Sequence, residues 1–231
     1  MGKFLPSNRG TALRVSNDLV SQNDTLPAST EYISLKDNIN RNASLPPAHN
    51  FSVKTGYAFI LNRTKGIVGN DKKLEDGLSA GLTWDVQYQY FPKSQYGFGA
   101  IYSGYYASTT VAGQYYNTSL SYIAPLFCTK GKIDEKWMLS INMGIGYLGM
   151  RQNTVNNVTI TAASVGTNIG IGAEYLLNKN WGIGLETSLL GGSFSKLTAT
   201  NGYETKVVVL EKQRIGASRV NLAVGIHCYL P

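Results

Sequence analysis

The stretch GLSAGLTWDVQYQY at residues 77–90 alternates between apolar side chains and small or polar ones along most of its length. Successive side chains of a β-strand point to opposite faces, so the stretch predicts a strand with one apolar and one polar face. The apolar face carries Leu78, Ala80, Leu82, Trp84, Val86, Tyr88 and Tyr90. The same design recurs about eight times between residue 50 and the C-terminus, which is typical of a transmembrane β-barrel with lipid outside and polar side chains inside.

The composition of the chain fits this class. Charged residues make up only 15% of the chain, whereas soluble domains average about 25%. No apolar run approaches the roughly 18 residues of a transmembrane helix. The net charge of +7 indicates solvated lysines on turns or attraction to anionic lipid headgroups. We expect no nucleic-acid binding, because the basic residues form no dense cluster. We expect no metal or other cofactor, because the two cysteines lack CxxC spacing.

The first 49 residues differ from the rest of the chain. They are rich in Ser, Asn, Asp and Pro, show no sustained period, and end near the stiff segment Leu45-Pro46-Pro47. We therefore expect residues 1–49 to form a flexible periplasmic tail, with a short folded plug as the alternative. Residues 50–231 are expected to form the barrel.

The alternation predicts eight antiparallel strands in up-and-down order, near residues 50–62, 77–91, 96–107, 114–127, 136–150, 158–177, 181–190 and 215–230. In the fourth strand, we expect the outward side chains to be Tyr116, Thr118, Leu120, Tyr122, Ala124 and Leu126. The short connections are Phe91–Gln95, Thr129–Glu135 and Asn178–Asn180, and the longer ones are Arg63–Asp76, Ser108–Gly113, Arg151–Asn157 and Gly191–Arg214. Short turns are periplasmic and long loops extracellular in outer-membrane barrels, so both chain ends are expected on the periplasmic side.

Aromatic residues are expected in two girdles at the membrane interfaces. The periplasmic girdle consists of Tyr90, Trp137, Tyr175 and Trp181, and the outer girdle of Tyr106, Tyr116 and Tyr147. In the last loop, Asn201-Gly202 is a hairpin signal, and we expect the seventh and eighth strands to project together as a ribbon beyond the membrane. Pairing Thr200 with Tyr203 would place Ile183 opposite Val220, and a bulge or longer loop would absorb the resulting overhang.

The predicted barrel interior contains five charged residues, namely Lys54, Asp85, Glu174, Glu186 and Arg219. Charges in a narrow lumen must pair or be hydrated, so we expect a salt-bridge network that closes the barrel. A small ion pathway is the alternative. The two glutamates are expected to serve Lys54 and Arg219.

Both cysteines are expected to be free thiols. Cys128 and Cys228 fall on the fourth and eighth strands with outward orientation, so their sulfurs would face lipid on opposite sides of the barrel. A disulfide requires a Cα separation of about 5.5 Å, which this placement does not allow.

The repeated Gly-aromatic strands GLSAGLTWDVQYQY, MLSINMGIGYLG and NIGIGAEYLLNKNWGIGLE, with a last strand at the C-terminus, resemble the small outer-membrane β-barrel proteins of Gram-negative bacteria. The Bacteroidetes-type outer-membrane β-barrel domain is the most similar in pattern. The resemblance covers about residues 50–231 and departs at Tyr229-Leu230-Pro231, where the family has a terminal aromatic residue. It implies an eight-stranded closed barrel in the outer membrane, often non-enzymatic, with a role in adhesion, surface defence or envelope integrity.

The sequence offers no convincing catalytic arrangement. Its only two histidines are His49 and His227. The triplet His227-Cys228-Tyr229 lacks the serine of the His-x-Ser pair that lipid A deacylases of similar size carry. We therefore predict a monomeric, non-enzymatic barrel that contacts outer-membrane lipid and lipopolysaccharide, and an extracellular protein or glycan through Lys72, Lys73, Lys196 and Lys206.

Three alternatives to this prediction stay open. One is a soluble ligand-binding barrel of the lipocalin kind, which would keep its apolar face inside. The others are a small pore and a membrane-embedded enzyme that acts on lipid or peptide.

Overall fold

The computed structural model describes residues 46–61, 72–154, 158–201, 203–210 and 214–230. Most of the predicted N-terminal tail, residues 1–45, lies outside these ranges. The first strand begins at His49.

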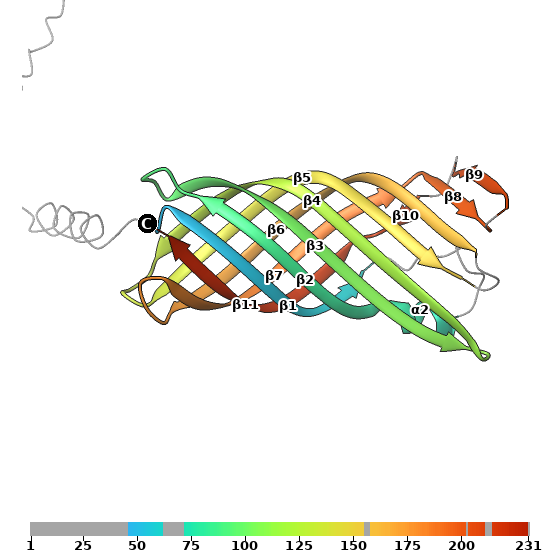
Figure 1. Cartoon of the computed structure of the whole chain (residues 1–231), viewed down its shortest axis with the longest axis horizontal. Helices are drawn as coiled ribbons and strands as arrows, with labels where there is room; N and C mark the ends of the chain where they lie inside the picture. The colour runs from blue at the N-terminus through green and yellow to red at the C-terminus, as the bar shows by residue number, and fades with distance from the viewer. Residues whose placement is uncertain (1–45, 62–71, 155–157, 202, 211–213, 231) are drawn as a thin grey trace, which may run out of the picture. The chain divides into compact units, whose positions relative to one another are not determined.

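Eight antiparallel strands close into a barrel (Figure 1). They are β1 (His49–Ile60), β2 (Ala80–Tyr90), β3 (Tyr96–Val111), β4 (Gln114–Lys132), β5 (Trp137–Asn153), β6 (Thr159–Leu176), β7 (Trp181–Phe194) and β11 (Arg219–Leu230). Strand β11 pairs with β7 on one side and with β1 on the other, which leaves the barrel without an open edge. The predicted all-β, eight-stranded, up-and-down barrel is confirmed.

Most of the large apolar side chains of the barrel strands face outward. Exposed residues include Phe51 and Val53 on β1, Leu82 and Val86 on β2, and an unbroken alternating series on β5 from Trp137 to Tyr147. The polar residues between them are buried. This orientation is the one that lipid requires, and it excludes a lipocalin-like barrel, whose apolar face would be internal.

Trp84 lies in the middle of β2 rather than at a membrane interface. It is opposite Gly104 on β3, and a Cβ atom on that glycine would come within 2.1 Å of the indole ring. The ring of Trp84 therefore packs across the bare backbone of Gly104. This packing explains both a tryptophan at mid-strand and a glycine beside it.

The predicted orientation of the fourth strand is wrong. Leu120, Tyr122 and Leu126 are buried, whereas Ile123 and Phe127 are exposed. Tyr116 lies on the same side of β4 as the buried residues and packs against the apolar core, so it does not belong to an outer girdle. The reason is that this interior contains large apolar side chains near its outer end, so side-chain size does not separate the two faces there.

The connection predicted at Ser108–Gly113 is not a long loop. Strands β3 and β4 stay paired up to Val111 and Gln114, and only Ala112 and Gly113 form the turn. Both turn residues have positive φ, 51° and 76°, which matches the two-residue turns with left-handed backbone that fit the twist of a hairpin. The hairpin is therefore a continuous extension of the barrel wall.

A second extension is the ribbon formed by β8 (Lys196–Thr200) and β9 (Thr205–Val209), which the sequence predicted. The predicted register is wrong, since Thr200 pairs with Thr205 and Ile183 pairs with Ile226. The short strand β10 (Ile215–Gly216) follows, and residues 211–213, between β9 and β10, lie outside the described residues, so the predicted bulge or longer loop is not tested. The ribbon is joined to the barrel through β8, which pairs with the first residues of β6.

The long connection after β1 contains the helix α2 (Lys72–Leu78). Leu74 and Leu78 of this helix are buried, and the Tyr105 hydroxyl on β3 donates a hydrogen bond of 2.8 Å to the Leu78 carbonyl. No helix in the described ranges is long and apolar enough to cross a membrane. Figure 1 shows α2, β8 and β9 at one end of the barrel and the short turns with the end of β11 at the other. We take the end with short turns as periplasmic and the end with α2 as outer.

Candidate functional site

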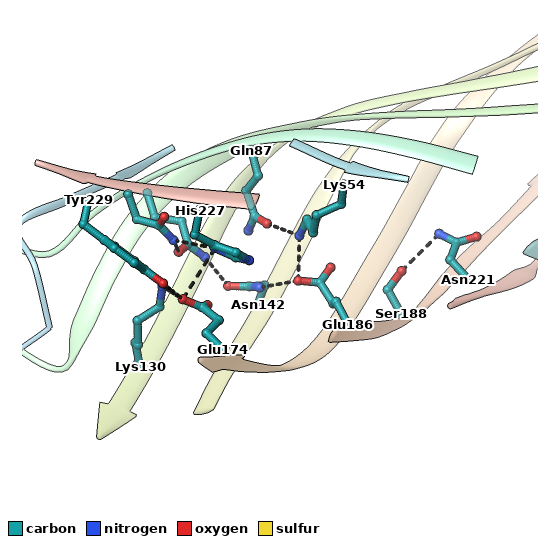
Figure 2. Close-up of polar contacts among 12 residues, drawn as sticks. Lys54, Gln87, Lys130, Asn142, Glu174, Glu186, Ser188, Asn221, His227 and Tyr229 are labelled. Carbon is teal, nitrogen blue, oxygen red and sulfur yellow. Dashed lines mark hydrogen bonds and ion pairs between the residues drawn. The ribbon is translucent and has the colours of Figure 1, made fainter. Parts of the chain in front are cut away.

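The periplasmic half of the interior contains two buried ion pairs, which Figure 2 shows among neighbouring polar groups. In the first, Lys54 Nζ on β1 lies 2.6 Å from Glu186 Oε2 on β7 and donates a second bond of 2.6 Å to Gln87 Oε1. Lys54 is only 1% exposed. Strand alternation turns each of these side chains inward, and the narrow lumen brings them within reach of one another.

The second ion pair joins Lys130 Nζ on β4 to Glu174 Oε2 on β6 at 2.9 Å. The same oxygen accepts a hydrogen bond of 2.6 Å from the Tyr229 hydroxyl and lies 3.4 Å from Nδ1 of His227. The ammonium of Lys130 also lies 5.6 Å from the centroid of the Phe91 ring. These contacts compensate for the burial of both charges.

Amide side chains connect the two ion pairs. Asn50 Nδ2 lies 3.5 Å from Nδ1 of His227, beside the second ion pair, and donates to Gln89 at 2.8 Å. Gln89 donates to Asn142 at 2.6 Å. Asn142 in turn lies 3.4 Å from the Glu186 carboxylate. The periplasmic half is thus crossed by a continuous polar network with contributions from β1, β2, β4, β5, β6, β7 and β11.

Arg219 lies closer to the outer end of the barrel than the two ion pairs and is fully buried. Its Nη2 donates a bond of 2.6 Å to Ser103 Oγ, and its guanidinium lies 5.4 Å from the Tyr105 ring centroid. Its Nε and Nη1 atoms, and Oδ1 of Asp85, have no hydrogen-bond partner among the described residues. Arg219 forms no ion pair with either glutamate, contrary to the pairing we expected.

The five predicted interior residues are therefore all buried, but the structure brings only Lys54 and Glu186 together as an ion pair. Sequence reasoning missed Lys130, because the reversed orientation of the fourth strand and an early end at residue 127 left it in a turn. The signal was available, since Lys130 is an even number of residues from Leu126 and so shares its face.

The outer half of the interior is filled by apolar side chains. Fully buried residues of this plug include Tyr105, Leu120, Tyr122, Leu148, Leu190 and Phe194. Leu74 and Leu78 of α2 and Leu197 of β8 belong to the same cluster. The helix and the ribbon thus extend the core beyond the barrel wall. We call this cluster the apolar plug.

Both cysteines are free, as predicted. The orientation of Cys128 differs from expectation, because it is buried inside the barrel with the inward face of β4. Cys228 lies on the outward face of β11, partly exposed. The wall of the barrel separates the two sulfurs.

Neither histidine forms a nucleophile–base pair in the described ranges. His227 is buried and stacks on Tyr229, with ring centroids 6.2 Å apart. His49 Nδ1 lies 2.8 Å from the hydroxyl of Tyr88 at the periplasmic end. The described residues also contain no group of three or more His, Cys, Asp or Glu that could hold a metal ion.

The aromatic residues predicted for the girdles lie mostly on the outer surface. Tyr90, Trp137 and Trp181 are exposed near the periplasmic end, and the ring of Trp137 lies 5.1 Å from that of Tyr175. At the outer end, Tyr106 and Tyr147 are exposed. Tyr106 shares a hydrogen bond of 2.7 Å with Tyr115, which sequence reasoning had not included.

Three of the lysines predicted as extracellular contacts can be placed by their side chains. Lys73 on α2 and Lys196 on β8 are exposed. Lys206 on β9 is also exposed and lies 3.7 Å from Glu204. Lys72 is the first residue of α2. All four therefore belong to elements at the outer end of the barrel.

Comparison with known proteins identifies the fold. No family model and no curated protein matches the sequence. The solved structure of Neisserial surface protein A matches with a TM-score of 0.56 and 10% identity over 79% of this chain and 97% of that one. The outer membrane protein OprG from Pseudomonas aeruginosa matches with a TM-score of 0.51 and 10% identity over 80% and 99%.

The outer membrane protease OmpT from Escherichia coli also matches, with a TM-score of 0.42 and 10% identity over 81% of this chain and 98% of that one. This last similarity is too low to bear on activity. The chain thus has the fold of the small outer-membrane β-barrels. Its apolar exterior and closed sheet are those of an integral barrel of the bacterial outer-membrane type.

Proposed function

We propose that this protein is a non-enzymatic outer-membrane barrel that makes contacts at the cell surface through ordered extensions of its wall. The observation that carries the proposal is that strand pairing continues past the apolar belt. The β3–β4 pairing reaches Val111 and Gln114, and the β5–β6 pairing reaches Asn153 and Thr159. These ends carry polar outward residues such as Ser108, which favours exposure to water rather than lipid.

The ribbon is the most prominent of these extensions. Every residue of β9 is exposed, including Val207 at 63%. In the described sheet, β9 pairs only with β8, so its other edge is open. An open edge of β-branched residues is a surface that an extended segment of a partner can join by main-chain hydrogen bonds.

Two alternative functions fit the interior less well. A pore requires a water-filled path, but Lys54, Glu174 and Arg219 are each at most 2% exposed and the apolar plug fills the outer half. A membrane-embedded enzyme requires reactive groups that a substrate can reach, and the buried imidazole of His227 is stacked on Tyr229.

A deletion of the ribbon tests the proposed surface role. Cells that display the full chain are compared with cells whose chain carries Asn-Gly in place of residues 196–210. The probes are an array of immobilised glycans and a set of extracellular-matrix proteins. We expect cells with the full chain to bind at least one of these probes, and cells with the ribbon deletion to have lost that binding.

A control carries Lys179→Gly, which places an Asn-Gly pair at residues 178–179 in the short turn between β6 and β7, at the periplasmic end. This control should bind like the full chain. Equal binding by the full chain and the ribbon deletion, with both barrels folded, would contradict a surface role for the ribbon.

A further inference from the structure

A polar hollow of about 460 Å³ lies on the outward faces of β4, β5, β6 and β8. We call it the outer groove. Its lining includes Ser119, Ser121, Gly149, Arg151, Ala163 and Lys196. The groove opens on the outside of the wall and is separate from the interior polar network, although Met150 and Ala162 of the apolar plug also line it.

Strand register arranges the groove in rows. Ser119 pairs with Arg151, Arg151 with Thr161, and Thr161 with Thr198 of β8. These four outward residues form one polar row across four strands. The row combines a guanidinium with three hydroxyl groups.

The next row toward the membrane contains small residues. Ser121 pairs with Gly149, and Gly149 pairs with Ala163. A Cβ atom on Gly149 would lie 3.0 Å from Ser121 Oγ and 3.1 Å from the Tyr147 ring, so the missing side chain contributes to the hollow. Lys196 lines the same hollow from β8.

The third row is apolar and faces lipid. It consists of Ile123, Tyr147 and Val165, which pair in register and are all exposed. Below it lies an apolar furrow of about 650 Å³ whose lining includes Pro125, Ile145, Thr167 and Gly191. The same face of the barrel therefore changes from hydrocarbon-facing to cationic over a few residues of each strand.

The distances match those of a lipid headgroup. Arg151 is four residues beyond Tyr147, or about 13 Å along the strand at about 3.3 Å per residue. A strand tilt near 40° makes this about 10 Å along the membrane normal. With the Tyr147 ring at the interface, as in aromatic girdles, the groove spans the polar layer of the outer leaflet, which is roughly 5–8 Å thick, and the backbone of Arg151 lies just beyond that layer.

The charge of the groove selects the ligand. Neither Arg151 nor Lys196 forms an ion pair within the described ranges, and no carboxylate is among the lining residues. Guanidinium, ammonium and hydroxyl donors together recognise phosphate. A soluble anion would leave the apolar row and the furrow unused, whereas an acylated phospholipid or phosphoglycolipid would use all three rows.

We propose that the outer groove binds the phosphate of an outer-leaflet lipid whose acyl chain lies along the apolar furrow. The inference rests on the outer-membrane placement and orientation of the barrel. It goes beyond the proposed surface role, because the ligand here belongs to the membrane itself and the site lies on the wall rather than on the ribbon edge.

The test is native mass spectrometry of the folded full chain in detergent with diphosphorylated lipid A as the probe. We expect the natural sequence to bind this probe at least about tenfold more tightly than the same lipid without phosphates. The reason is that hydrogen bonds to charged groups contribute more than those between neutral groups. Excess inorganic phosphate should compete poorly, because it lacks the acyl chains. Equal binding of the two lipids, or full displacement by inorganic phosphate, would overturn the proposal.

Two variants locate the site. Arg151→Glu with Lys196→Glu should weaken binding of diphosphorylated lipid A by about tenfold or more, and Ala163→Trp should do the same by filling the groove without a change of charge. The matched control is Lys93→Glu with Lys179→Glu, which makes the same change in charge on two periplasmic turns and should leave binding within twofold.

Heat-dependent mobility in gel electrophoresis verifies that each variant is folded. If the double groove variant does not fold, Ala163→Trp and the single variant Lys196→Gln decide the question. Unchanged binding in the folded groove variants, or an equal loss in the control, would refute the site. The lipid assay uses purified protein, so its failure is distinct from a failure of the cell-surface binding assay.

Discussion

The two halves of the barrel interior are stabilised in different ways. In the periplasmic half, Lys54, Lys130 and Glu174 belong to a connected set of ion pairs and amide hydrogen bonds. In the outer half, Leu148 and Phe194 pack among other buried apolar side chains. The comparison shows that one narrow lumen can be closed by charge pairing at one end and by packing at the other. The two ends should therefore respond differently to substitution.

The largest effect is expected at the buried ion pair of the polar half. Lys130→Ala removes the cation 2.9 Å from Glu174 and leaves a buried carboxylate with only Tyr229 and His227 as polar neighbours. We expect a loss of about 3–5 kcal/mol in the free energy of unfolding, because an uncompensated buried charge is costly. Urea-induced unfolding in lipid vesicles measures this loss.

The double variant Lys130→Met with Glu174→Leu sharpens the result. It removes both charges, so part of the stability lost in Lys130→Ala should return. A single variant as stable as the natural sequence would show that the ion pair does not hold the periplasmic half together.

A somewhat smaller effect is expected in the apolar plug. Leu148→Ala removes a fully buried side chain and should lower the free energy of unfolding by about 2–4 kcal/mol through lost burial and the void that remains. Leu148→Met keeps the volume and should cost less than about 1.5 kcal/mol. The same unfolding experiment measures both variants, and equal losses would argue against tight packing at this end.

The β3–β4 turn offers a smaller change of opposite sign. Ala112 has a φ of 51°, a region that Asn adopts more readily than Ala. Ala112→Asn creates the Asn-Gly pair preferred in such turns and should stabilise the barrel by about 1 kcal/mol. A loss of stability in this variant would contradict the two-residue turn.

The exposed ion pair on the ribbon should contribute least. Lys206 and Glu204 are 3.7 Å apart and their side chains are 78% and 67% exposed. We expect Lys206→Ala to change the free energy of unfolding by less than about 0.5 kcal/mol, because water and salt screen such pairs. A loss in the free energy of unfolding as large as that of Lys130→Ala would contradict the expected difference between buried and exposed ion pairs.

The outward face of most barrel strands could be predicted from alternation alone. In β2, for example, Leu82, Trp84 and Val86 are apolar and their neighbours are not, so only one orientation suits lipid. In β4 this rule fails, because Leu120 and Tyr122 fill the plug while Ser119 and Ser121 lie in the polar outer groove. Where the interior is apolar and the exterior is polar, the strand still alternates, but its apolar residues point inward and its polar residues point outward.

The partners of the interior charges could be predicted only in part. Alternation correctly turned Lys54 and Glu186 inward, but which cation meets which carboxylate depends on strand stagger around the barrel. Lys130 was missed with the orientation of its strand, so the prediction left only Lys54 and Arg219 as partners for the two glutamates, whereas Glu174 pairs with Lys130. The register of the ribbon failed for a related reason, because Thr200–Thr205 and Ile183–Ile226 belong to different registers, and no period in the sequence signals the change between them.

The central claim is that an apolar outer surface of the barrel faces hydrocarbon, while paired charges lie in the periplasmic half of its interior. Depth-dependent fluorescence quenching by brominated lipids tests it most directly, with variants that keep Trp84 or Trp181 as the sole tryptophan. We predict that Trp84, at mid-strand, is quenched most by bromine deep in the acyl chains, and Trp181, the first residue of β7, most by bromine near the headgroups. The absence of quenching at both tryptophans in the folded protein would contradict the account.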